Sequence, residues 1–128
     1  TKYYEKEFGQ NLKKKFIIFR EPIRKEDLAE IKKTANELES KYRLNAKRQI
    51  NIDPGYIDRT SLVMASSKKM PFKKEISENI FAHKILEFDE NEIITFRHTF
   101  QDYKTEICKK FLKEIFCSLK NENKPILN

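Results

Sequence analysis

The stretch that decides the fold is Arg48-Gln49-Ile50-Asn51-Ile52-Asp53-Pro54-Gly55-Tyr56. Apolar and polar side chains alternate along its first part, Arg48–Ile52, with the two-residue period of a β-strand that has one polar face. The proline that follows fixes its own φ and has no amide donor, and the glycine after it accepts a positive φ. We therefore predict a strand that ends in a tight turn at Asp53–Tyr56.

The acid of this turn has two interpretations. In the first, Asp53 bonds the backbone of its own turn and has no further role, as is common for aspartate. In the second, Asn51, Asp53 and Tyr56 point into one cleft, where Asp53 is the acid, base or metal ligand of a reaction. This turn is the best-defined candidate site in the sequence.

The composition favours one folded domain. Of the 128 residues, 38% are hydrophobic and 12% are aromatic, which supports a core and argues against disorder. Lysine and arginine number 27 and aspartate and glutamate 20, which gives a net charge of 27 − 20 = +7. We predict a single α+β domain over residues 1–120 and a frayed tail over residues 121–128.

The positive charge permits contact with phosphates or acidic surfaces, but it is spread in short groups such as Lys13-Lys14-Lys15 and Lys68-Lys69. No nucleic-acid-binding module or phosphate-binding glycine-rich loop is recognisable. No apolar run approaches the roughly 20 residues of a membrane span, so we expect no membrane partner. Cys108 and Cys117 lie about 13 Å apart on one predicted helix, too far for a disulfide, which favours a cytoplasmic location.

Apolar periodicity predicts two main helices. One covers about residues 25–42, and the second opens near Thr99, with Thr99 or Asp102 as its cap. Thr1–Phe8 has the pattern of a short helix or turn. The predicted fold class is α+β, an antiparallel sheet of about five to six strands with two main helices packed on it. The strands are predicted at residues 16–19, 48–52 and 62–65, with three more forming an antiparallel meander within 75–96.

A second candidate site lies in Arg97-His98-Thr99-Phe100-Gln101-Asp102-Tyr103. Its histidine titrates near neutrality, so it is either a catalytic acid or base or an exposed loop histidine. His83, in contrast, has the strand parity of a core-facing residue. No metal-ligand cluster is recognisable, and no cofactor is indicated. The candidate site residues are Asp53 and His98 for catalysis, and Asn51, Tyr56, Asp102, Tyr103 and Tyr4 for ligand binding.

Four blocks of sequence carry a family resemblance. They are Tyr3-Tyr4-Glu5-Lys6-Glu7-Phe8-Gly9, Asn51-Ile52-Asp53-Pro54-Gly55-Tyr56, Leu62-Val63-Met64-Ala65-Ser66 and Thr99-Phe100-Gln101-Asp102-Tyr103. Together they resemble the bacterial domain-of-unknown-function family 4416, from about Thr1 to Phe116. The resemblance implies no settled activity, although some relatives carry the label "GTP-binding protein". It also implies a strand-helix-strand segment before the paired tyrosines, which we expect this chain to lack.

The chain departs from the family pattern at several polar positions. Ser61 stands where the pattern favours Lys, and Phe72-Lys73-Lys74-Glu75 covers the region of a His-Arg pair. His83 stands where an acid is favoured. The resemblance therefore supports a shared site only at the positions that match, which are Asn51, Asp53, Tyr56, Asp102 and Tyr103.

Three functions agree with these features. The first is a binding module for an anionic ligand, a nucleotide or RNA, because of the positive charge and the polar turn. The second is an enzyme, a hydrolase or transferase that acts on a phosphorylated or nucleotide substrate through Asp53, with Tyr56 and His98 as donors. The third is a non-catalytic interaction domain whose exposed sheet edge pairs with a second copy of the chain in a homo-oligomer. The sequence slightly favours the first and leaves open whether the chain is an enzyme.

Overall fold

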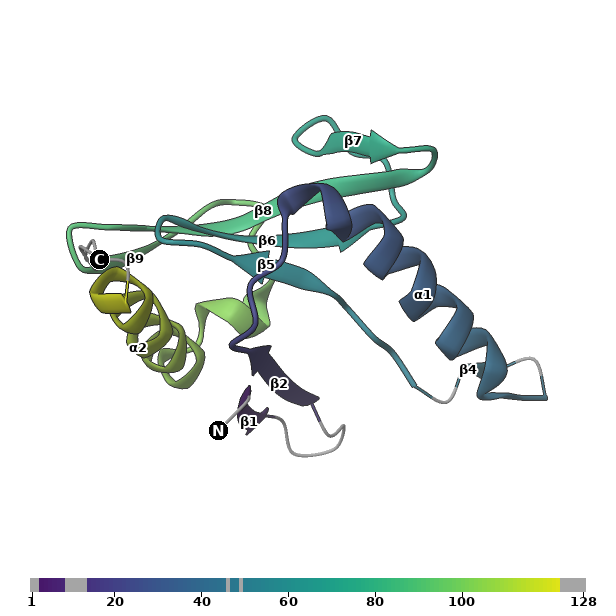
Figure 1. The fold of residues 1–128 in the computed structure, drawn as a ribbon, viewed down its shortest axis with the longest axis horizontal. Coiled ribbons are helices and arrows are strands. Elements are labelled where there is room, and N and C mark those ends of the chain that lie inside the picture. The colour runs from purple at the N-terminus through teal and green to yellow at the C-terminus, as the bar shows by residue number, and fades with distance from the viewer. Residues whose placement is uncertain (1–2, 9–13, 46, 49, 123–128) are drawn as a thin grey trace.

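The computed structural model describes residues 3–8, 14–45, 47–48 and 50–122. Figure 1 shows an antiparallel sheet with two long helices, and a separate hairpin near the N-terminus. The predicted α+β class is therefore confirmed. In chain order the elements are β1 (Tyr3–Phe8), β2 (Lys14–Phe19), η1 (Lys25–Asp27), α1 (Leu28–Lys41), β3 (Arg43–Leu44), β4 (Lys47–Arg48), β5 (Gly55–Ile57), β6 (Ser61–Ser66), β7 (Lys74–Ser77), β8 (Ile80–Asp89), β9 (Glu92–Thr95), η2 (Gln101–Lys104) and α2 (Glu106–Glu122).

The main sheet has five strands in the order β5-β6-β8-β7, with β9 also paired to β8. All of its pairings are antiparallel. The meander predicted within 75–96 is confirmed as β7, β8 and β9, with turns at residues 78–79 and 90–91. Asn79 in the first turn and Glu90 and Asn91 in the second have positive φ, between 49° and 63°, a conformation that asparagine tolerates better than most residues.

The two helices pack on opposite faces of this sheet. On β6, Val63 and Ala65 pack with Leu28 of α1. The adjacent residue, Leu62, belongs instead to the larger core cluster that includes Leu112 and Phe116 of α2. Because successive side chains of a strand point to opposite faces, the sheet is covered on both sides. Within the described residues, no helix combines the length and the apolar character that a membrane span requires.

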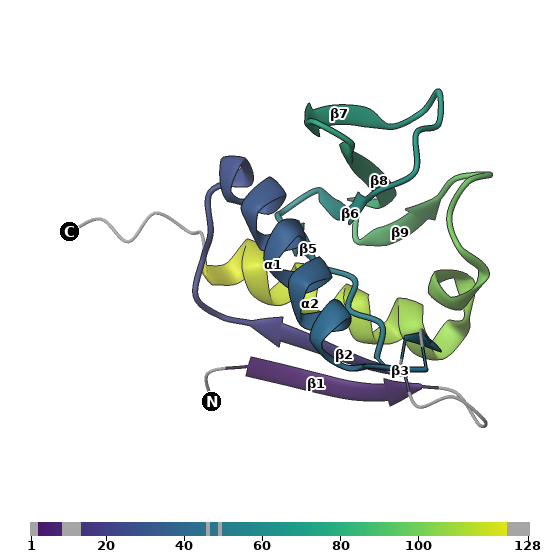
Figure 2. The ribbon, with the colours of Figure 1, turned by 90° about the vertical axis from the view of Figure 1, so that its right-hand side faces the viewer.

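The hairpin β1–β2 corrects one prediction. Tyr3–Phe8 is a strand that pairs antiparallel with β2, from Tyr3 opposite Phe19 to Phe8 opposite Lys14, and not a short helix or turn. Periodicity does not distinguish the two structures here. An aromatic residue at each end of a short polar run is compatible with a strand and with a short helix. The hairpin is anchored by Phe16, whose ring stacks on Tyr103 at 5.3 Å and on Phe111 at 6.3 Å between centroids. It lies beside α2 and η2 in Figure 2.

The predicted turn at Asp53–Tyr56 is also wrong. The strand predicted at residues 48–52 is wrong too, because of its described residues only Arg48 lies in a strand (β4) and residues 50–54 lie in none. The chain instead joins the sheet at the predicted turn, where the Pro54 carbonyl accepts from the Ala65 amide at 2.9 Å and Gly55 and Tyr56 begin β5. Gly55 lies directly against β6, where an added Cβ would collide with the Val63 carbonyl oxygen and the Met64 sulfur. The glycine is therefore needed for close approach of two strands, and not for a turn.

The start of the last helix differs from the prediction. Thr99 and Asp102 precede α2 by several residues, and Asp102 lies in η2. The helix instead begins after Thr105, whose hydroxyl accepts from the Cys108 amide at 3.3 Å, the geometry of an N-cap. The helix runs to Glu122, so the predicted tail is described only at its first two positions, and residues 123–128 lie outside the described part of the chain.

Candidate ligand-binding site

The longest strand, β8, has one edge that two short strands share. It pairs with β6 along one edge, while β7 pairs with residues 80–82 and β9 with residues 86–89 on the other. The loop after β9 fills the gap between β7 and β9. There the His98 Nε2 donates to the Lys84 carbonyl at 3.1 Å, and the Thr99 hydroxyl donates to the Ile85 carbonyl. The loop is thereby held against the middle of the sheet.

His83 projects from β8 beneath this loop. The prediction of a core-facing side chain is confirmed, because His83 is only 2% exposed. Three rings surround it, with centroids at 5.0 Å for Phe72, 5.1 Å for His98 and 5.4 Å for Phe100. Burial, together with the neighbouring Lys73 and His98, lowers the pKa of His83 to about 4. The imidazole is therefore neutral at pH 7.

Lysines gather at the rim of these rings. The Lys73 ammonium donates to the Ser66 hydroxyl at 2.9 Å and lies 5.9 Å from the centroid of Phe72. Burial, and then the charge of Lys68, lowers the pKa of Lys73, as expected for ammonium groups that lie close together. Lys68 and Lys69 are exposed. Among the described residues, no carboxylate forms an ion pair with any of these three lysines.

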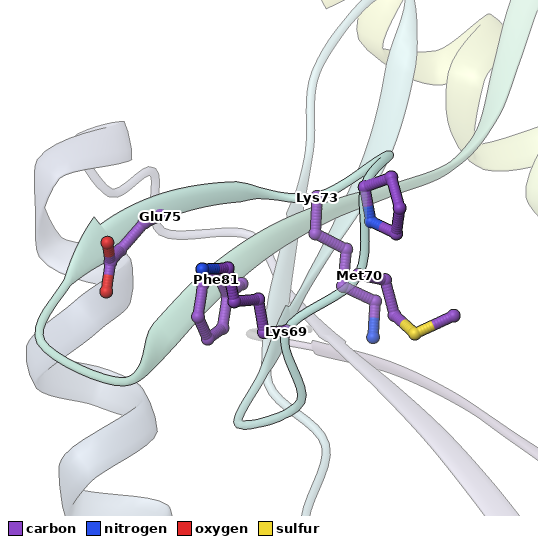
Figure 3. Close-up of a pocket in the computed structure, with 6 residues that line it drawn as sticks. Lys69, Met70, Lys73, Glu75 and Phe81 are labelled. Atoms are coloured by element: carbon purple, nitrogen blue, oxygen red, sulfur yellow. The ribbon is translucent and has the colours of Figure 1, made fainter.

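A shallow cavity of about 320 Å³ opens beside these lysines. Lys69, Met70, Lys73 and Phe81 line it, together with Pro71 and Glu75. Figure 3 shows Lys73 and Met70 side by side, with the Glu75 carboxylate directed away from them. That carboxylate accepts from the Asn79 amide at 3.4 Å. The cavity therefore presents mainly ammonium groups and apolar carbon to a ligand.

We call this surface the lysine–aromatic patch. Its rings are exposed to different degrees: Phe100 is 53% exposed and Phe72 42%, whereas His98 is half-buried. Planar rings flanked by cations suit a ligand that has both a flat apolar face and negative charge. The patch consists of Lys68, Lys69, Phe72, Lys73, His98 and Phe100, with His83 beneath them.

The predicted site around Asp53 lies elsewhere. Its carboxylate is exposed and accepts from the Asn51 side-chain amide at 2.8 Å. Asp53 also lies near the buried Tyr103. Burial, and then the charge of Asp53, raises the pKa of Tyr103 far above its ordinary value. The structure thus brings Asn51, Asp53 and Tyr103 together, with Asp102 exposed next to Tyr103 in the chain.

Tyr56 does not share this cluster. Its neighbour Ile57 packs in the core cluster with α2, whereas Tyr56 packs with Leu28 on the face that α1 covers. There the Lys25 ammonium lies 5.7 Å from the Tyr56 ring centroid and 3.4 Å from an oxygen of Asp58. Asn51, Asp53 and Tyr56 are therefore not arranged around one cleft.

The carboxylate of Asp58, just after β5, accepts hydrogen bonds from the backbone of its own turn. Its Oδ1 accepts from the amides of Thr60 at 2.9 Å and Ser61 at 2.8 Å. Although partial burial raises the pKa of Asp58, these hydrogen bonds and Lys25 lower it below its ordinary value overall. The carboxylate thus stays charged and bonded, and its function is structural.

The two predicted catalytic residues have different surroundings. Asp53 contacts Asn51 and influences Tyr103, while His98 contacts Phe72, His83 and the Lys84 carbonyl. No direct contact joins Asp53 to His98 within the described part of the chain. The link between them is a row of rings that runs from His98 through His83 and Phe100 to Tyr103. The backbone of Tyr4 lies in β1, and its side chain is outside the described residues.

Among the residues of the patch and His83 beneath them, only His98 is predicted from the sequence as a site residue. Phe72 and Lys73 come from the loop between β6 and β7, Phe100 comes from the loop after β9, and His83 comes from the middle of β8. Only the phenylalanine that stands between two pairs of lysines in residues 68–74 indicates a basic aromatic surface in advance. The four residues meet because the loop after β9 folds back against β8, which is a long-range contact that no local pattern encodes.

Comparison with known proteins gives a family but no function. The family model described as "Domain of unknown function (DUF4416)" matches residues 1–116. No curated protein matches the chain, and no solved structure matches it either. Among the described residues, no group of three or more histidine, cysteine, aspartate or glutamate side chains is placed to hold a metal ion.

Proposed function

The chain belongs to the family of domains of unknown function DUF4416, and we propose that it is a binding module for an anionic ligand with a planar base, a nucleotide or single-stranded RNA. The observation that carries this proposal is the lysine–aromatic patch. In it, ammonium groups that form no ion pair among the described residues lie beside exposed aromatic residues on one surface.

The charge in the patch is available to a ligand, unlike much of the charge elsewhere. Lys33, Lys84 and Lys113 each lie within 3.6 Å of a glutamate oxygen. Lys73 instead bonds a neutral hydroxyl, close to Lys68. A phosphate bound between such lysines relieves their mutual repulsion and releases counterions, so the association depends on salt.

The rings supply the other half of a nucleotide site. Bases stack on exposed aromatic side chains at about 1–3 kcal/mol for each base, with little dependence on sequence. Phe72 and His98 already stack with centroids 4.3 Å apart and their planes 11° from parallel. A base placed on the exposed face of Phe72 extends this stack, and its phosphate then lies within reach of Lys73.

The enzyme alternative has weaker support. It requires Asp53 and His98 to act on one substrate, but each contacts a different set of residues. The His98 Nε2 also donates a hydrogen bond to the Lys84 carbonyl, and this bond fixes the loop. The interaction alternative rests on β5, which pairs with β6 alone among the described strands. Light scattering at high protein concentration tests it, because a strict monomer excludes a homo-oligomer through that edge.

Fluorescence anisotropy with a labelled decauridylate tests the proposed function. We expect binding at low salt that weakens as salt is added, with a log–log slope of about −0.7 for each phosphate contact. The triple variant K68Q/K69Q/K73Q should lose roughly tenfold or more in affinity, with a slope less negative by about 2.

The matched control is K33Q/K84Q/K113Q, which removes the same charge from lysines that are paired with glutamates. We expect its affinity to change by less than about threefold, because exposed ion pairs contribute little. Absence of wild-type binding at low salt would rule out the proposed function. Equal losses in the two triple variants would show that net charge, and not the patch, drives binding.

A further inference from the structure

His83 has a buried nitrogen without a partner. Its Nε2 is shielded from solvent and makes no hydrogen bond, although every other fully buried side-chain nitrogen or oxygen of the described residues has a partner. A buried polar group without a partner costs on the order of 1–3 kcal/mol. Such atoms are rare in folded proteins, and each calls for an explanation, such as strain, a water or ion bound to it, or a functional role.

The cover over this nitrogen is thin. His83 lies under Phe72, His98 and Phe100, and two of these rings are about half exposed, Phe72 at 42% and Phe100 at 53%. His98 is fixed by its bond to the Lys84 carbonyl. Neither phenylalanine makes a hydrogen bond through its ring, so rotation of one side chain opens a path from the patch to His83.

We propose that His83 is the specificity-determining residue of the patch, where its Nε2 hydrogen-bonds the polar edge of a nucleobase that enters between the Phe72 and Phe100 rings. This inference rests on the proposed function and adds a base preference to it. The phosphate is held by Lys68, Lys69 and Lys73, which cannot distinguish one base from another.

The chemistry of His83 and its surroundings suits the recognition of a base. The imidazole is neutral, so its Nε2 offers one donor or one acceptor according to its tautomer, and no net charge that would favour every nucleotide alike. Its neighbours include the Phe72 and Phe100 rings, and aromatic rings stack with any base. A base with the complementary group at its edge satisfies the buried nitrogen, and a base without it leaves both partners unbonded.

Competition among oligonucleotides tests the inference. Ten-residue oligomers of uridine, cytidine and adenosine are bound to the wild type, to His83→Phe and to Lys73→Gln under one salt condition. We expect the wild type to prefer one base by about fivefold or more, the factor that one hydrogen bond supplies. His83→Phe keeps the ring and the stacking surface, so its affinities for the three oligomers should converge to within about twofold. Lys73→Gln should weaken all three alike.

Each outcome has a separate meaning. No binding of any oligomer to the wild type removes the proposed function itself. Binding with no base preference, or a preference that His83→Phe retains, overturns the assignment of His83 and leaves the patch as an unspecific anion site. If His83→Phe fails to fold, NMR of the wild-type imidazole decides. The preferred oligomer should shift the His83 Nε2 resonance, and an unchanged resonance at saturation overturns the inference.

Discussion

The Asn51–Tyr56 segment and the lysine–aromatic patch differ in whether their polar groups are bonded to other groups of the protein. In the segment, Asn51 bonds Asp53, and the Ile52 amide donates to the buried carboxylate of Glu39 at 2.7 Å. In the patch, three lysines form no ion pair within the described part of the chain, and His83 has a buried nitrogen without a partner. The most distinctive motif in the sequence thus uses its polar groups to build the fold.

The difference indicates where binding free energy is available. A polar group already bonded within the protein must lose that bond before it can bind a ligand, so its net contribution is small. A group that is buried without a partner, or close to a like charge, gains on binding. For this reason we place the site at the patch, and we place the fold-determining function at the segment.

The largest effect should come from Gly55→Ala. The added methyl meets the Val63 carbonyl and the Met64 side chain, so we expect the free energy of unfolding to fall by about 3 kcal/mol in urea titrations. Ser67→Ala, at an exposed position in the next loop, is the control and should change it by less than about 0.5 kcal/mol. An unchanged midpoint for Gly55→Ala would mean that β5 does not approach β6 as closely as described.

Acid should lower the stability of the folded protein, because His83 is protonated more readily in the unfolded chain. Its pKa is lower in the folded protein, about 4, than the ordinary value of 6.5. The unfolded chain therefore takes up a proton first. The stabilisation is complete above pH 6.5 and is lost as the pH falls towards 4. The stabilisation that is lost amounts to about 3 kcal/mol.

The comparison of wild type with His83→Phe isolates this contribution, because the carboxylates titrate alike in both proteins. Urea midpoints measured from pH 7 down to pH 4 should fall more steeply for the wild type. Parallel curves for the two proteins would show that His83 is accessible to protons in the folded state.

Phe72→Leu tests the stacking surface. Leucine keeps the apolar volume but loses the flat ring, so the affinity for decauridylate should fall by about fivefold to thirtyfold, which corresponds to about 1–2 kcal/mol. Phe19→Leu is the control, because Phe19 is 69% exposed on the hairpin and lies outside the patch. Comparable losses of affinity in both variants would show that binding does not depend on the aromatic surface of the patch.

Asp53→Asn should have the smallest effect. The carboxylate is exposed, and among the described residues its hydrogen bond is to Asn51, so we expect a loss of less than about 0.5 kcal/mol in stability and less than a twofold change in affinity. A large loss of affinity would show that the ligand binds at the Asn51–Tyr56 segment and not at the patch.

The sequence predicts most of the architecture, because periodicity reports buried faces directly. The wide face of α2 and the alternation of β8 mark side chains that reach the core. The apolar stripe of α1 does so only in part, because Leu28 and Ala35 are buried whereas Leu38 is 39% exposed. The local patterns fail where a distant strand decides the outcome. Glycine is a residue type typical of turns, but close contact with β6 makes Gly55 part of a strand.

The candidate site was less predictable. His98 could be identified by its residue type, but its bond to the Lys84 carbonyl depends on a gap between β7 and β9 that appears only in the folded sheet. His83 could be assigned to the core, but its missing hydrogen-bond partner depends on which rings cover it. The predicted Asp53–His98 pair rested on chemistry alone, without the geometry that joins two residues.

The most direct test of the central claim is an NMR titration of the ¹⁵N-labelled protein with decauridylate at low salt. We predict that the largest amide shifts occur at Lys68, Phe72, Lys73, His98 and Phe100, and that residues 51–58 change little. Shifts concentrated at residues 51–58, or no shifts at saturating oligonucleotide, would contradict the account.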